Sequence, residues 1–452
     1  MYKKGDSLLT SNYRPISILP SLSKIFECVL IDQLSEYFEP LLDDVLSGFR
    51  KQHGCQHVLL NFVEKCKNVL DDGKLYGALL TDLSKAFECV PHRLLISKLN
   101  AYGMDYLSCK LISSYFLDRK QRVKLGSVKG QWMALTRGTP QGSIFGPFIF
   151  NLFQNDMMYV LKQHCDLYNY ADDTTLGVGS NTVVNLCMRL QRATHTMLEW
   201  CSINHLKANP DKFQFIIFST KENNASLHIS DNVTIMSRPC VKLLGVFLDS
   251  HLKFGEHITT LCKKAGKHLN VLARMSRSLD VKGKLILLQS FITCHFNYCS
   301  IIWHYCSASD LKKIENVQYR GLKFVYYDFL SSYVVLRERA GLPLLYVRRL
   351  RTIALELFKI CNDIGPSYLK SYFKRSSRQY DMRRGSSLVL PKYKTVKYGK
   401  KCFKFHAVKL WNDLNYDCTH AANLQAFREI INVWSGPQCQ CSYCDICVLH
   451  RF

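Results

Sequence analysis

Two adjacent carboxylates, Asp172 and Asp173, constrain the fold of this chain more than any other feature. The apolar and aromatic residues from Asp166 to Tyr170 predict one strand, and residues 174–178 predict the returning strand of a β-hairpin. Short carboxylate side chains tolerate a tight turn because they bond to the local backbone. Neighbouring like charges destabilise a fold unless a positive group lies beside them, and a divalent metal ion is the obvious candidate. A solvated turn without a ligand is the alternative, and the turn alone leaves both open.

A third carboxylate, Asp82, ends the short apolar run 77–81, which predicts a buried strand. Alone, Asp82 is expected to cap a following helix. Combined with the hairpin pair, it supplies the third ligand of a two-metal phosphoryl-transfer site. Between these positions lies a stretch rich in glycine and proline, residues 137–147, whose backbone can approach a ligand closely. It is either part of a binding site or an ordinary loop before the apolar helix expected at about 148–161.

The net charge of the chain indicates what kind of molecule it binds. The chain has 452 residues, a formal charge of +24 and a pI near 9.3. Such an excess of Lys and Arg indicates a polyanionic partner, either nucleic acid or a membrane surface. A hydrophobic fraction of 47% with 21% charged residues is typical of globular rather than disordered chains, and the length allows two or three domains. Polar residues interrupt the most apolar stretch, 285–305, which predicts a buried helix and no membrane span.

The 20 cysteines are scattered, and no charged-then-apolar leader opens the chain. We therefore expect reduced thiols and a location in the nucleus or cytoplasm, without secretion or a transmembrane segment. At the C-terminal end, four cysteines are candidate ligands for a structural Zn²⁺, but their spacing is shorter than in an ordinary zinc finger. Zinc binding and reduced, flexible thiols both remain open for this tail. These cysteines are Cys439, Cys441, Cys444 and Cys447.

Five motifs follow one another along the chain, and two more extend the series. They are Asn12-Tyr13-Arg14-Pro15-Ile16-Ser17, Gly48-Phe49-Arg50, Asp82-Leu83-Ser84-Lys85-Ala86-Phe87, Thr139-Pro140-Gln141-Gly142-Ser143 with Gly146-Pro147, and Tyr170-Ala171-Asp172-Asp173, followed by residues 204–212 and 243–249. In this order and spacing they closely resemble the reverse transcriptases of non-LTR retrotransposons, in particular the jockey-like long interspersed elements. In weaker form the resemblance covers nearly the whole chain.

That resemblance implies an α+β right-hand polymerase with fingers, a palm with an antiparallel sheet, and a helical thumb, followed by a helical, basic C-terminal region. The expected boundaries are 1–75 for N-terminally truncated fingers, 76–255 for the palm with inserted fingers segments and a primer-grip turn, 256–345 for the thumb, 346–436 for a basic nucleic-acid-binding region, and 437–452 for the Cys-rich tail. Family members usually carry an endonuclease domain before the fingers, so we expect this chain to lack one.

The implied activity is RNA-directed DNA synthesis, in which a dNTP adds to a DNA primer 3′-hydroxyl on an RNA template. The metal ligands would be Asp82, Asp172 and Asp173, holding two Mg²⁺ ions with Mn²⁺ as a substitute. Arg14 would hold the triphosphate, and Lys212 would protonate or neutralise the pyrophosphate, although Lys212 also fits a surface lysine after a turn. Phe87 would act as a steric gate against the ribose 2′-hydroxyl, and the remaining substrate-binding positions are Gln141, Gly142 and Tyr170.

Residues 371–409 form the most basic region. Lysines and arginines alternate there with Tyr380, Tyr393, Tyr398, Phe403 and Phe405, which predicts phosphate contacts beside rings that stack on bases. A solvated basic face over a small core is the alternative. The rival to a polymerase is a catalytically silent, nucleic-acid-binding remnant of a truncated element.

Overall fold

The computed structural model describes most of the chain, which divides into two compact units. Unit 1 comprises residues 1–54, 77–215 and 224–237, and unit 2 comprises residues 55–76, 216–223 and 238–452. The residues described are 2, 6, 8–9, 12–13, 16–230, 233–275, 278–375 and 388–437. Within these ranges, no helix has the length and apolar character that a membrane span requires.

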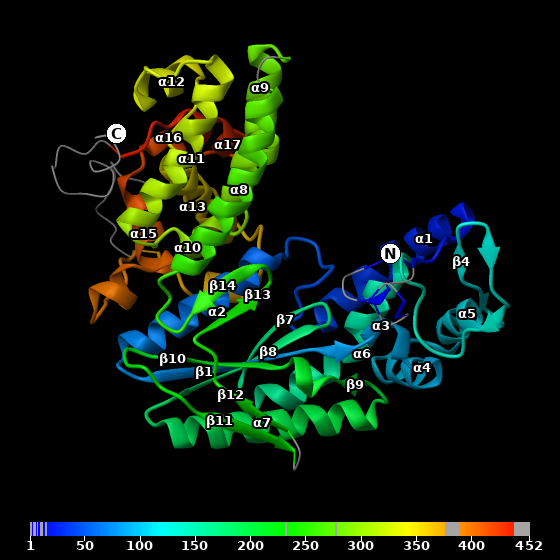
Figure 1. Ribbon diagram of the computed structural model, residues 1–452. Helices are drawn as coiled ribbons and strands as arrows, with labels where there is room; N and C mark the ends of the chain where they lie inside the picture. The colour runs from blue at the N-terminus through cyan, green and yellow to red at the C-terminus, as the bar shows by residue number, and fades with distance from the viewer. Residues whose placement is uncertain are drawn as a thin grey trace. The chain divides into compact units, whose positions relative to one another are not determined.

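A four-stranded sheet with the strand order β10-β1-β8-β7 carries the carboxylate positions (Figure 1). The predicted hairpin is confirmed as β7 (Asp166–Tyr170) and β8 (Asp173–Ser180), which pair antiparallel. The predicted strand before Asp82 is confirmed as β1 (Leu75–Thr81), and six of its seven residues are buried. The fourth strand is β10 (Gln214–Phe218).

The apolar helix α6 (Phe145–Lys162) is the centre of unit 1 and packs against α1, α3, α4, α7 and β7. It begins three residues earlier than predicted. Pro147 is tolerated in its first turn, and the buried Glu27 accepts the backbone N–H of Ile144 at 2.7 Å. The start of this helix is therefore set by Glu27, a carboxylate more than a hundred residues away, and not by a capping residue next to the helix.

The other elements of unit 1 are mostly short. They are α1 (Ser21–Phe38), η2 (Glu39–Leu41), β2 (Leu83–Ser84), α3 (Ala86–Cys89), α4 (His92–Ala101), α5 (Tyr106–Phe116), β3 (Lys120–Gln121), β4 (Lys124–Leu125), β5 (Val128–Lys129), β6 (Met133–Ala134), α7 (Val183–Ile203), β9 (Lys207–Ala208), η3 (Pro210–Lys212), β11 (Ser226–Ser230) and β12 (Val233–Met236).

Unit 2 is largely helical. Its elements are α2 (Cys55–Asp71), β13 (Cys240–Leu243), β14 (Val246–Asp249), α8 (Gly255–Met275), α9 (Val281–Leu287), the π-helix η4 (Leu288–Ile292), η5 (Thr293–Phe296), α10 (Ser300–Trp303), α11 (Ala308–Tyr326), α12 (Tyr333–Arg339), α13 (Leu345–Cys361), α14 (Ser367–Lys370), the π-helix η6 (Val396–Lys400), α15 (Phe403–Asp413), α16 (Tyr416–Thr419) and α17 (Leu424–Val433).

The prediction of one buried helix over 285–305 is wrong. The stretch contains the end of α9, a π-helical turn, a 3₁₀ turn and α10. Cys299 adopts a φ of 47°, which no continuous right-handed helix allows. Ile286 and Phe291 are also more than half exposed. An apolar run therefore covers several short elements here, because composition alone does not fix the local backbone.

Candidate active site

The carboxylates Asp172 and Asp173 lie at the tip of the β7–β8 hairpin. Tyr170 pairs with Asp173, so Ala171 and Asp172 form a two-residue turn. Ala171 has a φ of 57°, a left-handed conformation that costs a residue with a Cβ roughly 1–2 kcal/mol. Asp172 and Tyr170 are half-buried, and Asp173 is exposed. The two carboxylates thus occupy different environments although they are adjacent in sequence.

Buried amide side chains hold this turn. The carbonyl oxygen of Ala171 accepts hydrogen bonds from Asn169 Nδ2 at 3.0 Å and from Gln154 Nε2 at 3.1 Å. Asn169 Nδ2 also donates to Thr174 Oγ1 at 3.0 Å, across the hairpin. Asn169 and Gln154 are both fully buried, so these bonds are shielded from water. The strained backbone of Ala171 is therefore fixed by two elements, its own strand and α6.

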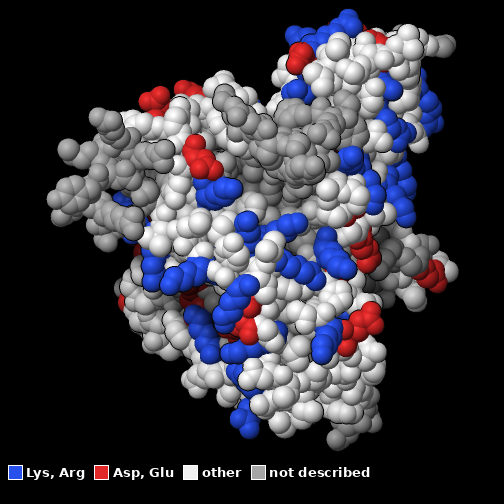
Figure 2. All heavy atoms as spheres, turned by 90° about the vertical axis from the view of Figure 1, so that its left-hand side faces the viewer, with Lys and Arg blue, Asp and Glu red and all other residues white. Residues whose placement is uncertain are grey.

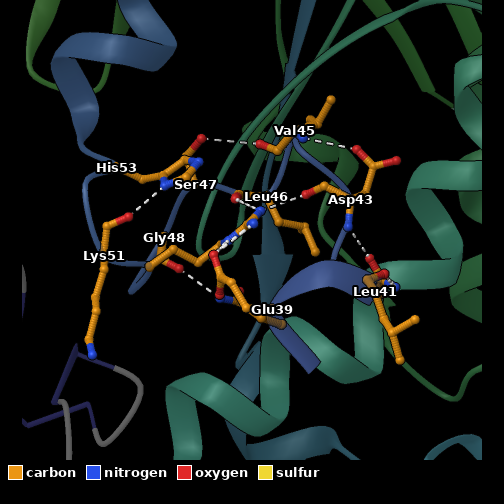
Figure 3. Close-up of polar contacts among 12 residues, drawn as sticks. Glu39, Leu41, Asp43, Val45, Leu46, Ser47, Gly48, Lys51 and His53 are labelled. Atoms are coloured by element: carbon orange, nitrogen blue, oxygen red, sulfur yellow. Dashed lines mark hydrogen bonds and ion pairs between the residues drawn. The ribbon is translucent and has the colours of Figure 1, made fainter. Parts of the chain in front are cut away.

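A second support for the turn is the loop that contains Gly48 (Figure 3). A Cβ on Gly48 would lie 2.4 Å from the backbone nitrogen of Ala171, so only glycine permits this approach. Asn151 Nδ2 donates to the Gly48 carbonyl oxygen at 2.7 Å. Asn151 and Gln154 are three residues apart on α6, so one face of this helix holds the loop and the turn together.

Arg50 organises the same loop from within. Its guanidinium donates to the carbonyl oxygens of Asp43 at 2.8 Å and Leu46 at 2.9 Å, and to Glu39 Oε1 at 2.9 Å (Figure 3). The Arg50 side chain is only 6% exposed. Asn155, also on α6, donates to the Leu41 carbonyl oxygen at 2.9 Å. The loop is thus fixed on both sides before it meets the hairpin.

Asp82 follows β1 and lies beside Lys212. The antiparallel pairing of β2 with β9 brings the two segments together, and Lys212 Nζ is 3.1 Å from Asp82 Oδ2. The backbone N–H of Asn209 donates to the Asp82 carbonyl oxygen at 2.9 Å. Because the two side chains are 34% and 62% exposed, solvent screens this ion pair, and it contributes at most about 1 kcal/mol to stability.

A hydrogen bond joins the two carboxylate positions. Thr81 Oγ1, next to Asp82, donates to the Thr174 carbonyl oxygen at 2.7 Å, next to Asp173. Among the described residues, however, no three His, Cys, Asp or Glu side chains form a group that could hold a metal ion. The structure therefore places Asp82 with Lys212 and joins its strand to the hairpin, while the three-carboxylate metal site stays a prediction.

Phe87 lies in α3 and is packed between two other rings. Its centroid is 4.5 Å from that of Phe150 and 6.3 Å from that of Phe49, which belongs to the Gly48 loop. The Phe87 side chain is half-buried, so one edge stays accessible. The Phe87 carbonyl oxygen accepts the backbone N–H of Thr139 at 2.8 Å.

Gln141 and Gly142 lie in the glycine-rich stretch, which extensive bonding holds in place. Gln141 Nε2 donates to Glu88 Oε1 at 2.5 Å, and the Gln141 carbonyl oxygen accepts the backbone N–H of Ser17 at 2.8 Å. Gly142 has a φ of 105°, which side-chain-bearing residues rarely adopt. Burial lowers the pKa of His92, whose Nε2 donates to the Gly138 carbonyl oxygen at 2.7 Å.

Three groups of predicted site residues lie outside the described residues. These are Arg14, Tyr380 of the basic region, and the tail cysteines Cys439, Cys441, Cys444 and Cys447.

The basic region differs in part from its prediction. The rings of Tyr398, Phe403 and Phe405 are 3%, 1% and 4% exposed, so they cannot stack on bases and the prediction for them was wrong. They belong to a core that also contains Trp411, because α15 and η6 pack against α2. Figure 2, which views the side where α15 lies in Figure 1, shows Lys and Arg gathered on the surface. The exposed lysines of this segment, among its described residues, are Lys374, Lys392, Lys394, Lys397, Lys400, Lys401 and Lys409.

Most residues that support the site belong to no recognised sequence motif; the exceptions are Gly48 and Arg50, which share one motif. Glu27, Asn151 and Gln154 are polar residues on otherwise apolar helical faces. A polar residue in such a position is expected to be buried with a hydrogen-bond partner, and this was the only sequence signal that could have identified them. The sequence marked Gly48 only as part of its motif, without showing what it contacts. Its close approach to Ala171 depends on segments more than a hundred residues apart, which no local pattern reports.

Comparison with known proteins confirms the resemblance. A family model for reverse transcriptase (RNA-dependent DNA polymerase) matches residues 2–248. The chain is 27% identical over 328 residues to a probable RNA-directed DNA polymerase from transposon BS of Drosophila melanogaster, covering 70% of this chain and 36% of the relative. It is 26% identical over 324 residues to the RNA-directed DNA polymerase from mobile element jockey of Drosophila funebris, covering 69% and 35%. The chain thus spans about a third of the length of these relatives.

Among solved structures, a telomerase from Candida tropicalis in complex with a telomeric RNA fragment aligns over 91% of this chain and 57% of that chain. The identity is 9% and the TM-score is 0.38, too low for an inference about the fold.

Proposed function

Because this chain belongs to the reverse transcriptase family, we propose that it is the RNA-directed DNA polymerase core of a non-LTR retrotransposon. One observation carries the proposal. Asp82 and the two turn carboxylates lie at the ends of strands, and the hydrogen bond from Thr81 to Thr174 joins these strands. Lys212 forms an ion pair with Asp82. Carboxylates from separate strands beside a lysine are what nucleotidyl transfer requires, since charge builds on the attacking and leaving oxygens.

Residues 1–75 would supply the fingers, residues 76–255 the palm, and the helices α8 to α12 the thumb. The sheet that contains β1 and the antiparallel β7–β8 hairpin would form the centre of the palm. The β13–β14 hairpin would form the primer grip. Within unit 2, Tyr298 supports the turn of this hairpin by donating to the Leu244 carbonyl oxygen at 2.7 Å.

Asp82, Asp172 and Asp173 would hold the divalent ions. Their hard carboxylate oxygens suit Mg²⁺, which usually binds through one or two carboxylates together with substrate phosphates, so a protein cluster of three ligands is not a precondition. Bound Mg²⁺ supplies Lewis-acid stabilisation of the attacking and leaving oxygens. The residues themselves position it, because the amides of Asn169 and Gln154 fix the turn on which Asp172 lies.

Lys212 would neutralise or protonate the departing pyrophosphate. In the described structure its ammonium is paired with Asp82, so it would exchange this partner for a phosphate when the nucleotide binds. The pair is screened by solvent, so this exchange costs little.

Phe87 would exclude ribonucleotides, because a ring fixed between Phe49 and Phe150 cannot move aside for a 2′-hydroxyl. Gln141, Gly142 and Tyr170 would line the nucleotide and template pocket, and Arg14 would hold the triphosphate. The exposed lysines of residues 392–409 would contact the phosphates of the RNA template or the DNA primer.

A second function, RNA binding without DNA synthesis, is favoured by one observation. The formal charge of +24 and the exposed lysines of residues 392–409 can bind RNA without any catalytic carboxylate.

Primer extension distinguishes the two functions. The assay uses a poly(rA) template, an oligo(dT) primer, dTTP and Mg²⁺, and compares wild type with Asp172→Asn combined with Asp173→Asn. We expect extension by wild type only, with RNA affinity within a few-fold between the proteins, because the variant keeps the hairpin but loses both charges. If wild type binds RNA normally but does not extend the primer, the polymerase function is rejected and RNA binding without DNA synthesis is supported.

A further inference from the structure

Residues 119–135 form a two-stranded ribbon that no assigned function uses. Lys120 and Gln121 pair with Ala134 and Met133, and Lys124 and Leu125 pair with Lys129 and Val128 around a two-residue turn. In Figure 1 the ribbon carries the label β4 and extends beside α5. Every residue from 120 to 134 is exposed. Since an isolated two-stranded hairpin is marginally stable in water, this ribbon gains most from a partner that covers it.

Charge on the ribbon indicates the chemistry of that partner. Residues 119–135 contain five cations and no Asp or Glu; the cations are Arg119, Lys120, Arg122, Lys124 and Lys129. Lys124 and Lys129 are directly opposite one another, and like charges at such a pair destabilise a sheet. An anion between the two strands would remove this repulsion. A polyanion with regularly spaced charges therefore fits the ribbon better than an apolar protein surface.

The ribbon also presents an aromatic ring. Trp132 is 59% exposed, and the Arg122 guanidinium lies over its ring at 4.5 Å. A cation and an exposed ring side by side are the elements with which proteins bind single-stranded nucleic acid, through phosphate contacts and base stacking.

We propose that the ribbon of residues 119–135 binds single-stranded RNA, with Lys124 and Lys129 on the phosphates and Trp132 stacked on a base. The proposal rests on the proposed function only in taking RNA as the ligand. It concerns a surface that carries none of the catalytic carboxylates.

Equilibrium binding of a short fluorescein-labelled single-stranded RNA by the full chain, without dNTP, tests the proposal. The variant is Lys124→Glu with Lys129→Glu. Its matched control is Lys24→Glu with Arg192→Glu, which makes the same change in net charge at two exposed helical positions. All four side chains are exposed, so far-ultraviolet circular dichroism should be unchanged in both.

We expect the ribbon variant to bind RNA about tenfold or more weakly and the control within about twofold of wild type. The slope of log affinity against log salt should fall by about 1.4 in the ribbon variant, because two phosphate contacts to a single strand are lost. Trp132→Ala should weaken binding by about tenfold at an unchanged salt slope, and Trp132→Phe should restore most of the loss.

Equal weakening by the ribbon variant and its control would overturn the proposal. A loss confined to an RNA–DNA duplex would also overturn it, as would intact RNA affinity with altered self-association, which would assign the ribbon to a protein partner. A wild-type chain that binds RNA through the ribbon but extends no primer would sink the polymerase function alone.

Discussion

The surroundings of the hairpin turn in unit 1 and the core of unit 2 bury polar groups of different kinds. Around the hairpin turn of unit 1 the buried groups are neutral amides, those of Asn151, Gln154, Asn155 and Asn169. Unit 2 instead buries ionisable side chains, among them Glu64, Lys67, Arg349 and Glu356, each at most 2% exposed. Burial lowers the pKa of Lys67, whose Nζ donates to the Lys401 carbonyl oxygen at 2.6 Å.

Neutral amides do not titrate, so the hydrogen bonds that they donate around the turn do not depend on pH. Buried ionisable groups make the stability of unit 2 depend on pH, because a change of protonation leaves a charge or a donor without its partner. The difference separates a turn held by groups that do not titrate from a helical unit whose stability depends on pH. Three substitutions break or sharpen this comparison.

The largest effect is expected for Gly48→Ala. The new methyl group would lie 2.4 Å from the Ala171 backbone nitrogen, and neither backbone can move away without displacing the turn. We expect a loss of more than about 4 kcal/mol in unfolding free energy or, if the loop shifts instead, primer extension lowered by a hundredfold or more. Urea unfolding and extension assays measure the two.

Gly266→Ala is the control for this substitution, because a Cβ there meets no atom within 4 Å. Alanine in this position of α8 should leave activity unchanged and raise stability by up to about 1 kcal/mol. Equal behaviour of the two alanine variants would show that the loop does not position the turn.

Asn151→Asp would place a buried titratable group in unit 1, so the stability of unit 1 would then depend on pH, as that of unit 2 does. A carboxylate cannot donate to the Gly48 carbonyl oxygen, whereas the protonated acid can, so we expect a loss of about 3 kcal/mol at pH 8 that partly recovers toward pH 6. Extension activity should follow the same pH profile. A flat profile matching that of wild type would contradict the role given to the amide.

His257 gives the smallest effect, in unit 2. Burial, followed by the charge of Lys242, lowers the pKa of His257 to about 4 from an ordinary value of 6.5. The unfolded chain then takes up a proton more readily than the folded one, so stability is complete above pH 6.5 and falls as the pH decreases toward 4. This loss is about 2 kcal/mol at pH 5.

Urea unfolding at pH 7.5 and pH 5 measures this loss. His257→Gln should show a smaller difference between the two pH values than wild type, and His228→Gln, at an exposed position of unit 1, should behave as wild type. An unchanged pH difference in His257→Gln would assign the loss to other buried groups.

Sequence patterns predicted the elements that bear local signals. The β7–β8 hairpin and β1 follow from alternation and a short apolar run, and both are confirmed. The start of α6 was placed late because its cap, Glu27, is contributed by another helix. Tyr398, Phe403 and Phe405 were placed on the surface because charges surround them in sequence, yet burying large rings outweighs the character of their neighbours.

For the site, the motifs predicted that Asp82, Asp172 and Asp173 lie at strand ends. They did not predict the hydrogen bonds and the strand pairing that position these residues. The pairing of Lys212 with Asp82 follows from β2 and β9, each two residues long, which carry too few residues for a periodic signal. The buried amides of α6 lie in a helix whose apolar residues dominate its pattern.

The β2–β9 pairing also has a kinetic consequence. Asp82 and Lys212 are 130 residues apart, and only two residue pairs join their strands directly. This contact joins residues far apart in sequence and contributes little enthalpy of its own. It therefore forms only after the sheet and helices between Asp82 and Lys212 have folded and brought the two segments close together. A growing chain therefore holds the hairpin carboxylates before it holds Lys212, and the site becomes complete among the last events of folding.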